Sequence, residues 1–243
     1  SGLAAWTVTP AAGTASLQTR VLKDVPKDLG QTIEVVDFPG SAQSFVIMAR
    51  RAPGADAADR YDAQVFNHSF AGSFTSRVNL NLREDKGYTY GARGGFSRAK
   101  MSGKYSVYAK VKRDTTRQSL DEMIMELKGV SSDRPVTTQE RDNSVNGILK
   151  GFPGRFERGG ALANQLAGLA AKGRPADELS GYPNQIAAVS LAKARASAEA
   201  YTDHENFAII IAGDWQKIKD SLTGLKRKVV FRNADGTLAP NTK

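Results

Sequence analysis

The chain contains no cysteine and only two histidines, His68 and His204, among its 243 residues. The lack of cysteine excludes disulfides and thiolate metal sites, and it leaves the redox compartment open. A zinc site that used both histidines would still need carboxylates at its other positions. No apolar run approaches the roughly 20 residues that a membrane-spanning helix requires. The sequence therefore predicts no membrane span and offers little material for a metal site.

The composition is that of a folded, basic protein. Hydrophobic residues make up 40% of the chain, which is enough for a sizeable core in one large or two small domains. The formal net charge is +9, which favours encounters with acidic partners, nucleic acid or membrane surfaces. Because the cations are spread along the chain, we interpret them first as an aid to solubility. The Ala- and Arg-rich composition without cysteine is compatible with a bacterial periplasmic or envelope protein.

Residues 1–30 are rich in Ala, Thr and Gly and are predicted to be a linker or N-terminal extension. Strands are predicted over residues 32–36, 43–51, 88–96 and 103–112. The last of these alternates cleanly, which is typical of a sheet with one buried face. Its predicted inward side chains are Tyr105, Val107, Ala109 and Val111.

Between these strands, apolar residues recur every four positions and predict a helical ridge. Gly72 and Ser73 interrupt the ridge, so we expect a kink or two shorter helices. The ridge consists of Phe66, Phe70, Phe74, Val78 and Leu82.

Helical patterns dominate the second half of the chain. The pair Thr137 and Glu140 has the spacing of a capping box, and Ser190 is placed to cap a later helix. A short apolar run over residues 206–212 predicts a central strand, and residues 233–243 form a polar tail expected to be loose. We therefore predict an α+β fold in one domain over residues 31–232, with helices covering one face of an antiparallel or mixed sheet. The predicted helices lie around residues 120–127, 137–149, 162–169, 177–186 and 190–201, with a short one from Trp215.

The most distinctive stretch is GSFTSRVNLNLREDKGYTYGARGG, residues 72–95. It is predicted to run from a helix through a glycine turn into a strand, with Arg83 and Tyr90 seven residues apart across the turn. This arrangement can direct a cation and a phenol into one space. Structural roles are also open at this point, because Arg83 could cap the helix C-terminus and Tyr90 could be an ordinary strand aromatic.

This stretch resembles a signature of the insulinase/pitrilysin-type zinc peptidases, the group that includes mitochondrial processing peptidase. Gln43 in SAQSFVIMAR, the segment GFPGRFERGGALANQL and the segment from Tyr182 to Asp214 also resemble parts of that family. The resemblance covers roughly residues 31–223 and is to the C-terminal half of a subunit.

The resemblance implies two homologous halves that enclose a chamber. One half holds zinc through the motif H-x-x-E-H, and the other supplies an Arg–Tyr pair that falls here on Arg83 and Tyr90, as catalytic and substrate-binding residues. No H-x-x-E-H occurs in this sequence. The resemblance thus implies no metal or cofactor in this chain, zinc in a homologous partner half, and a peptide substrate. The chain would be the substrate-binding half of a zinc endopeptidase, inactive alone.

Two other interpretations are kept. The chain could be a catalytically inactive interaction or assembly subunit of the same family. Nucleic-acid binding is less favoured, because a solvated face is the default interpretation of the basic residues on the strand over residues 103–112. The glycine run at residues 91–95 lacks a phosphate-loop pattern, so it does not predict a phosphate site. Tyr105 and Tyr108 are predicted to point to opposite sides, so they form no base-stacking platform.

Overall fold

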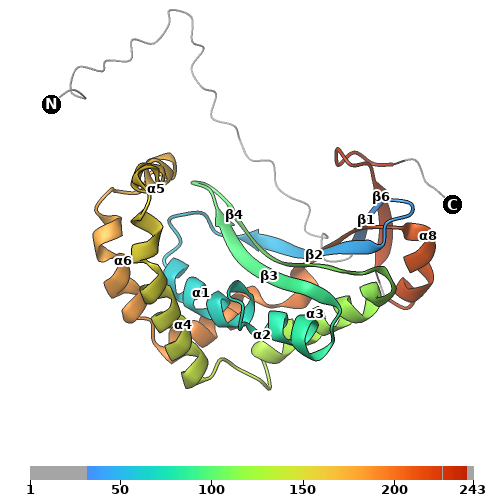
Figure 1. The fold of residues 1–243 in the computed structure, drawn as a ribbon, viewed down its shortest axis with the longest axis horizontal. Helices are drawn as coiled ribbons and strands as arrows, with labels where there is room; N and C mark the ends of the chain where they lie inside the picture. Colours follow the sequence, from blue (N-terminus) through green and yellow to red (C-terminus); the bar gives the residue numbers. More distant parts are fainter. Residues whose placement is uncertain (1–31, 226, 240–243) are drawn as a thin grey trace, which may run out of the picture.

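A computed structural model describes residues 32–225 and 227–239, which contain a single mixed sheet. Figure 1 shows the sheet with the helices gathered against one face. The spatial order of its strands is β3-β4-β2-β5-β1-β6. The strands are β1 (Thr32–Asp37), β2 (Gln43–Ala52), β3 (Thr89–Arg98), β4 (Gly103–Lys112), β5 (Ala208–Gly213) and β6 (Lys228–Arg232).

The sheet is antiparallel on one side and parallel on the other. β4 pairs antiparallel with both β2 and β3, and β5 pairs antiparallel with β2. β1 lies between β5 and β6 and is parallel to both. The alternation in β4 has the predicted outcome, because Tyr105, Val107, Ala109 and Val111 are all buried on the helical side.

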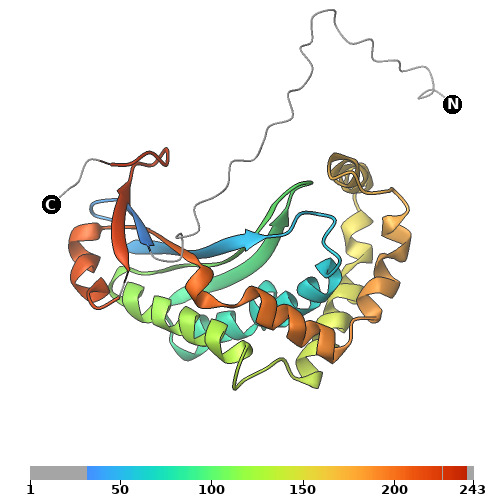
Figure 2. The same cartoon turned by 180° about the vertical axis from the view of Figure 1, so that it is seen from behind.

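The helices cover one face of the sheet, while α4, α5 and α6 rise beside it as a wall (Figures 1 and 2). The opposite face of the sheet carries no other described element, so the molecule is concave on that side. The α-helices are α1 (Arg60–Asn67), α2 (Arg77–Asn79), α3 (Thr116–Val130), α4 (Thr138–Gly151), α5 (Gly159–Ala171), α6 (Glu178–Ala187), α7 (Leu191–Tyr201) and α8 (Trp215–Ile218). The π-helical turns are η2 (His68–Gly72) and η3 (Leu80–Asp85), and the 3₁₀ turns are η4 (Arg113–Thr115), η5 (Pro153–Phe156), η6 (His204–Asn206) and η7 (Lys219–Leu222).

The predicted interruption of the apolar ridge at Gly72 and Ser73 is confirmed. η2 ends at Gly72, Ser73 is extended, and helix resumes at Arg77. One part of the ridge prediction is wrong: Phe74 is 53% exposed, whereas the other four ridge residues are buried. The reason is that Phe74 lies in the non-helical break, where the four-residue spacing no longer sets the direction of a side chain.

The helix starts predicted in the second half are also confirmed. Thr137 and Glu140 form a complete capping box at α4, and the Ser190 hydroxyl accepts a hydrogen bond from the backbone N–H of Lys193. Strand β6 was not predicted. It is a five-residue edge strand, and its pattern KVVFR gives too few alternations to identify a strand by periodicity.

The ends of the chain are only partly described. The predicted linker over residues 1–30 lies outside the described residues. Residues 233–239 follow β6 and turn back, so that Leu238 forms a bridge with Arg232. The predicted boundaries of the domain stay a prediction. In the described ranges, no helix is both long and apolar enough to cross a bilayer.

Candidate functional site

The buried side chain of Asn79 joins the helical segment to the strand that carries Tyr90. Its Nδ2 donates to the carbonyl oxygen of Phe74 at 2.6 Å, and its Oδ1 accepts from the backbone N–H of Ala92 at 2.9 Å. Asn79 is fully buried, so both hydrogen bonds are shielded from water. Loss of either partner in such a setting leaves a buried polar group unsatisfied. Asn79 therefore fixes the relative position of residues 74–92.

The turn between Arg83 and Tyr90 depends on Gly87. Its φ is +63°, in the left-handed region that a residue with a Cβ rarely adopts. The N–H of Lys86 donates to the carbonyl of Asn81 at 3.0 Å, and the N–H of Tyr88 donates to that of Leu82 at 2.9 Å. These hydrogen bonds fix the backbone at the end of η3, and they therefore also fix the direction in which β3 begins.

β3 begins with an irregularity that places Tyr90 outside the regular ladder. The register against β4 shifts between Thr89 and Ala92. The N–H of Gly91 donates to the Thr89 hydroxyl oxygen at 3.1 Å and holds the bulge locally. Bulges of this kind redirect side chains at a sheet edge. The Tyr90 side chain is accordingly turned to solvent, with 91% of the residue exposed.

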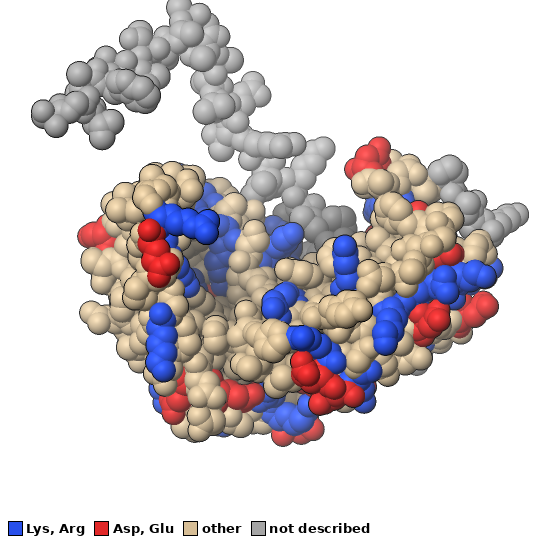
Figure 3. All heavy atoms as spheres, in the orientation of Figure 1, with Lys and Arg blue, Asp and Glu red and all other residues tan. Residues whose placement is uncertain are grey.

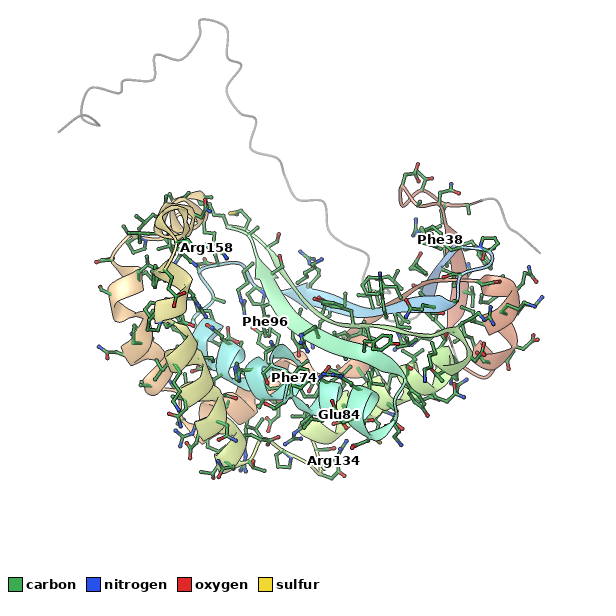
Figure 4. All side chains as sticks on the ribbon, viewed as in Figure 1. Phe38, Phe74, Glu84, Phe96, Arg134 and Arg158 are labelled. Carbon is green, nitrogen blue, oxygen red and sulfur yellow. The ribbon has the colours of Figure 1, made fainter. Side chains whose placement is uncertain are left out.

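Arg83 is anchored by its neighbours but keeps part of its guanidinium accessible. Its Cζ lies 4.4 Å from the centre of the Phe74 ring, and its Nε lies 3.4 Å from Glu84 Oε1. The side chain is 34% exposed. Figure 4 labels Phe74 and Glu84 near the turn into β3. Among the described residues, Arg83 donates no hydrogen bond to a helix carbonyl, so the capping role considered from the sequence is not observed.

Arg83 and Tyr90 are thus carried by adjoining elements without touching. No hydrogen bond or cation–π contact joins them in the described ranges, and the Tyr90 hydroxyl has no hydrogen-bond partner there. The accessible part of the Arg83 guanidinium and the Tyr90 hydroxyl can consequently donate to a molecule outside this chain.

The two histidines do not form a metal site. His68 lies in η2 beside Gly147, and burial lowers its pKa. His204 lies in η6, and burial followed by repulsion from Lys128 lowers its pKa. Within residues 32–225 and 227–239, no group of three or more His, Asp or Glu residues could hold an ion. The described donors therefore do not fit zinc, and we derive no chemical step through a metal in this chain.

The sequence did not predict a pocket of about 440 Å³ between β3 and the helical wall. We call it the wall pocket. Its residues come from distant parts of the chain, so no local motif could have indicated it. Lining residues include Arg60, Tyr61, Arg98, Phe152, Arg155 and Tyr182.

Solved structures with the same fold include several peptidase-related proteins. A peptidase M16 inactive domain from Pseudomonas fluorescens is 19% identical, with a TM-score of 0.67 over 75% of this chain and 43% of that one. A proposed zinc protease from Bordetella pertussis is 15% identical, with a TM-score of 0.60 over 70% of this chain and 93% of that one. A chain of Complex III2 from Candida albicans is 12% identical, with a TM-score of 0.65 over 78% of this chain and 47% of that one. The chain spans less than half the length of the first and third.

These similarities confirm the α+β fold predicted from the sequence. No curated protein matches the sequence. The family model described as the peptidase M16 inactive domain matches residues 9–148, which is more than half of the chain. This match confirms the resemblance to insulinase/pitrilysin-type peptidases noted above. The chain belongs to the peptidase M16 inactive-domain family.

Proposed function

We propose that this domain is the substrate-binding half of a zinc-dependent endopeptidase. Arg83 and Tyr90 act on the peptide, and a homologous partner half carries zinc in an H-x-x-E-H motif. The partner half is either another chain or another part of the same polypeptide. Alone, the domain has no hydrolytic activity.

The observation that best supports this proposal is the state of Tyr90. An aromatic residue that is 91% exposed contributes little to the folding of its own chain. Nevertheless, Asn79, Gly87 and the bulge at Thr89 fix the backbone that presents it. A rigid backbone under an exposed phenol is what a site needs when it acts by positioning.

The chemistry fits the donors that are present. Hydrolysis of a peptide bond passes through an oxyanion, which a phenol hydroxyl can stabilise as a hydrogen-bond donor. A guanidinium keeps its charge at all relevant pH values and can hold a substrate carbonyl or carboxylate. Both groups act as donors throughout the reaction, and neither needs to take up a proton.

Conservative variants of the two residues test this assignment. In an active mixture with an H-x-x-E-H half, Tyr90→Phe and Arg83→Gln should each lower kcat/KM about a hundredfold, because each removes a donor that stabilises the transition state. Tyr88→Phe is the matched control, since Tyr88 packs against the core and its variant should keep the wild-type rate. Unchanged hydrolysis by both Tyr90→Phe and Arg83→Gln would show that the assigned roles are wrong.

The alternative is an inactive interaction or assembly subunit. It is favoured by the family's description as an inactive domain and by the similarity to a chain of Complex III2. It predicts stable association with a partner and no chelator-sensitive turnover in the complex. In that case the Tyr90→Phe change would leave association with the partner unaltered.

A further inference from the structure

The wall pocket lies where the end of β3 meets the helical wall. It is lined from α1, β3, η5, α5 and α6, and Figure 3 shows a hollow between the wall and the sheet with Lys and Arg atoms inside it. Four cations and one carboxylate line the pocket. They are Arg60, Arg98, Arg155, Lys172 and Glu178.

Two of these cations are accessible and uncompensated. Arg155 and Lys172 are both exposed, and neither forms an ion pair within the described ranges. The Arg155 Cζ lies 5.3 Å from the centre of the Tyr182 ring and 5.7 Å from that of Phe152. These contacts hold the guanidinium over an aromatic surface without neutralising it. Both side chains can therefore reach an anion that enters the pocket.

The one carboxylate in the pocket is already neutralised. Glu178 Oε2 accepts from Arg174 Nε at 2.5 Å, and its Oε1 accepts from the Tyr61 hydroxyl at 3.0 Å and Arg60 Nε at 3.4 Å. Burial raises the pKa of Glu178, but the Arg174 and Tyr61 hydrogen bonds outweigh burial and keep this pKa below its usual value. Glu178 therefore stays charged and occupied, and the excess charge of the pocket is positive.

Arg98 adds a buried positive charge. Its side chain is only 10% exposed, and its guanidinium Cζ lies 4.7 Å from the centre of the Phe96 ring. Nη1 donates to the carbonyl of Pro53, but Nη2 is buried without a hydrogen bond and lies 3.9 Å from Asp59 Oδ1. Asp59 offsets part of this charge, and Arg155 and Lys172, unpaired within the described ranges, keep the pocket positive.

The remaining surface suits an apolar group. Phe152 and Tyr182 stack with ring centres 4.8 Å apart, and Tyr61 meets Tyr182 edge-on at 5.8 Å. Asn67 also lines the pocket, where its Nδ2 donates to the carbonyl of Gly94 at 3.0 Å. Cations and an aromatic wall thus occur together in one cavity.

We propose that the wall pocket binds a peptide carboxylate together with a neighbouring apolar side chain. The carboxylate is either the C-terminus of a peptide or an acidic side chain. The proposal rests on the proposed function only in taking the ligand to be a peptide. Arg98 follows Tyr90 by eight residues along β3, or roughly 25 Å of strand. An extended peptide that reaches both places therefore needs about eight residues between the two contacts.

Direct binding to this chain alone tests the proposal. The probe is a neutral, fluorescein-labelled peptide that ends in Phe, compared with its C-terminal amide by fluorescence anisotropy at low salt. We expect amidation to weaken binding about tenfold, because it removes the charge that the pocket attracts. A second pair of amidated peptides, with an internal Glu or Gln next to Phe, tests the side-chain source. Equal affinity within both pairs would overturn the proposal.

Matched variants locate the binding. Arg155→Gln and Lys172→Gln should each weaken binding of the charged peptide about fivefold and remove most of its preference over the neutral one. Arg158→Gln removes the same charge three residues away, outside the residues that line the pocket, and should have little effect. Equal losses from Arg155→Gln and Arg158→Gln would mean that net charge, not the pocket, attracts the peptide.

The same assay separates this proposal from the proposed function. Arg83→Gln and Tyr90→Phe should keep the preference for the carboxylate, since both residues lie outside the pocket. A mixture without hydrolysis but with this preference would refute only the catalytic assignment. Hydrolysis that depends on Tyr90 without any carboxylate preference would refute only the pocket.

Discussion

At the scale of single residues, the groups that build the candidate site and the groups that would use it are different. Asn79 and Gly87 determine where the backbone goes, and they are, respectively, fully buried and held at positive φ. Arg83 is partly exposed and contacts the Phe74 ring and the Glu84 carboxylate, whereas Tyr90 is almost fully exposed. Mutation of the first pair is expected to affect stability, and mutation of the second pair function.

The last two glycines of the GARGG segment, Gly94 and Gly95, should respond differently to the same substitution. A Cβ on Gly94 would lie 2.6 Å from the Ala71 Cβ and 3.1 Å from the Ser106 carbonyl oxygen, where β3 packs on η2. Gly94→Ala should therefore lower the free energy of unfolding by about 1–3 kcal/mol. Gly95 has nothing within 4 Å of such a Cβ, so Gly95→Ala should change stability by at most about 0.5 kcal/mol. Urea unfolding measures both, and similar losses would contradict this packing.

At the scale of elements, the link between α2 and α4 combines a helix cap with an ion pair. Glu140 receives two hydrogen bonds from Arg77, at 2.5 and 2.6 Å, while it closes the capping box with Thr137. Arg77 also donates to the carbonyl of Pro135 at 2.9 Å. The Glu140 carboxylate thus links α2 to α4 and also caps the N-terminus of α4.

This link should make stability depend on pH. Burial raises the pKa of Glu140, but the bonds from Arg77 and Thr137 outweigh burial and lower this pKa below its unfolded value. The stabilisation is therefore present above the unfolded pKa, about 4.3, and is lost as pH falls through the folded pKa. At pH 7, Glu140→Gln should lower the free energy of unfolding by about 2 kcal/mol relative to the wild type. Near pH 3 the difference should be smaller, because the wild type loses this stabilisation as Glu140 gains a proton, whereas glutamine does not titrate.

Urea unfolding of wild type and variant at both pH values measures this difference. Glu199→Gln is the matched control, because Glu199 is exposed on α7 and forms no ion pair in the described part of the chain. The free energy of unfolding of Glu199→Gln should equal that of the wild type at both pH values. A Glu140→Gln variant that loses the same amount at each pH would contradict the account of this link.

Patterns confined to one segment were predictable from the sequence, and arrangements that join distant segments were not. The alternation in β4 and the capping box at α4 depend on neighbours along the chain, so spacing alone revealed them. The prediction for Phe74 was wrong because the four-residue spacing continues in the sequence through residues 73–76, where the backbone is not helical. β6 is too short for periodicity to identify.

The candidate site divides along the same line. Arg83 and Tyr90 were predicted as site residues from one continuous stretch and a resemblance. The direction of Tyr90 could not be predicted in this way, because it depends on the bulge at Thr89. The wall pocket could not be predicted from the sequence, because Tyr61, Arg98 and Tyr182 lie far apart in the chain and come together only in the folded structure. No spacing rule relates residues so far apart in the sequence.

At the scale of the whole molecule, no described element covers the sheet face between the helical wall and the β6 end (Figures 1 and 2). The open face includes Phe45 and Tyr108, whose rings meet edge-on at 5.8 Å. A concave sheet face of this kind suits an extended peptide. In the part of the chain that the structure describes, no group of three or more His, Asp or Glu residues could hold a metal ion. Under the proposed function, a second half completes the enzyme.

The most direct test of that central claim is peptide hydrolysis by this chain alone and in a mixture with an H-x-x-E-H half, each with and without a chelator. The account predicts no turnover by the chain alone, turnover in the mixture, and its loss on chelation. Chelator-sensitive hydrolysis by this chain alone would contradict the account, because it would require a metal site within the chain. The account would also be contradicted if the isolated H-x-x-E-H half, without this chain, hydrolysed the peptide as fast as the mixture.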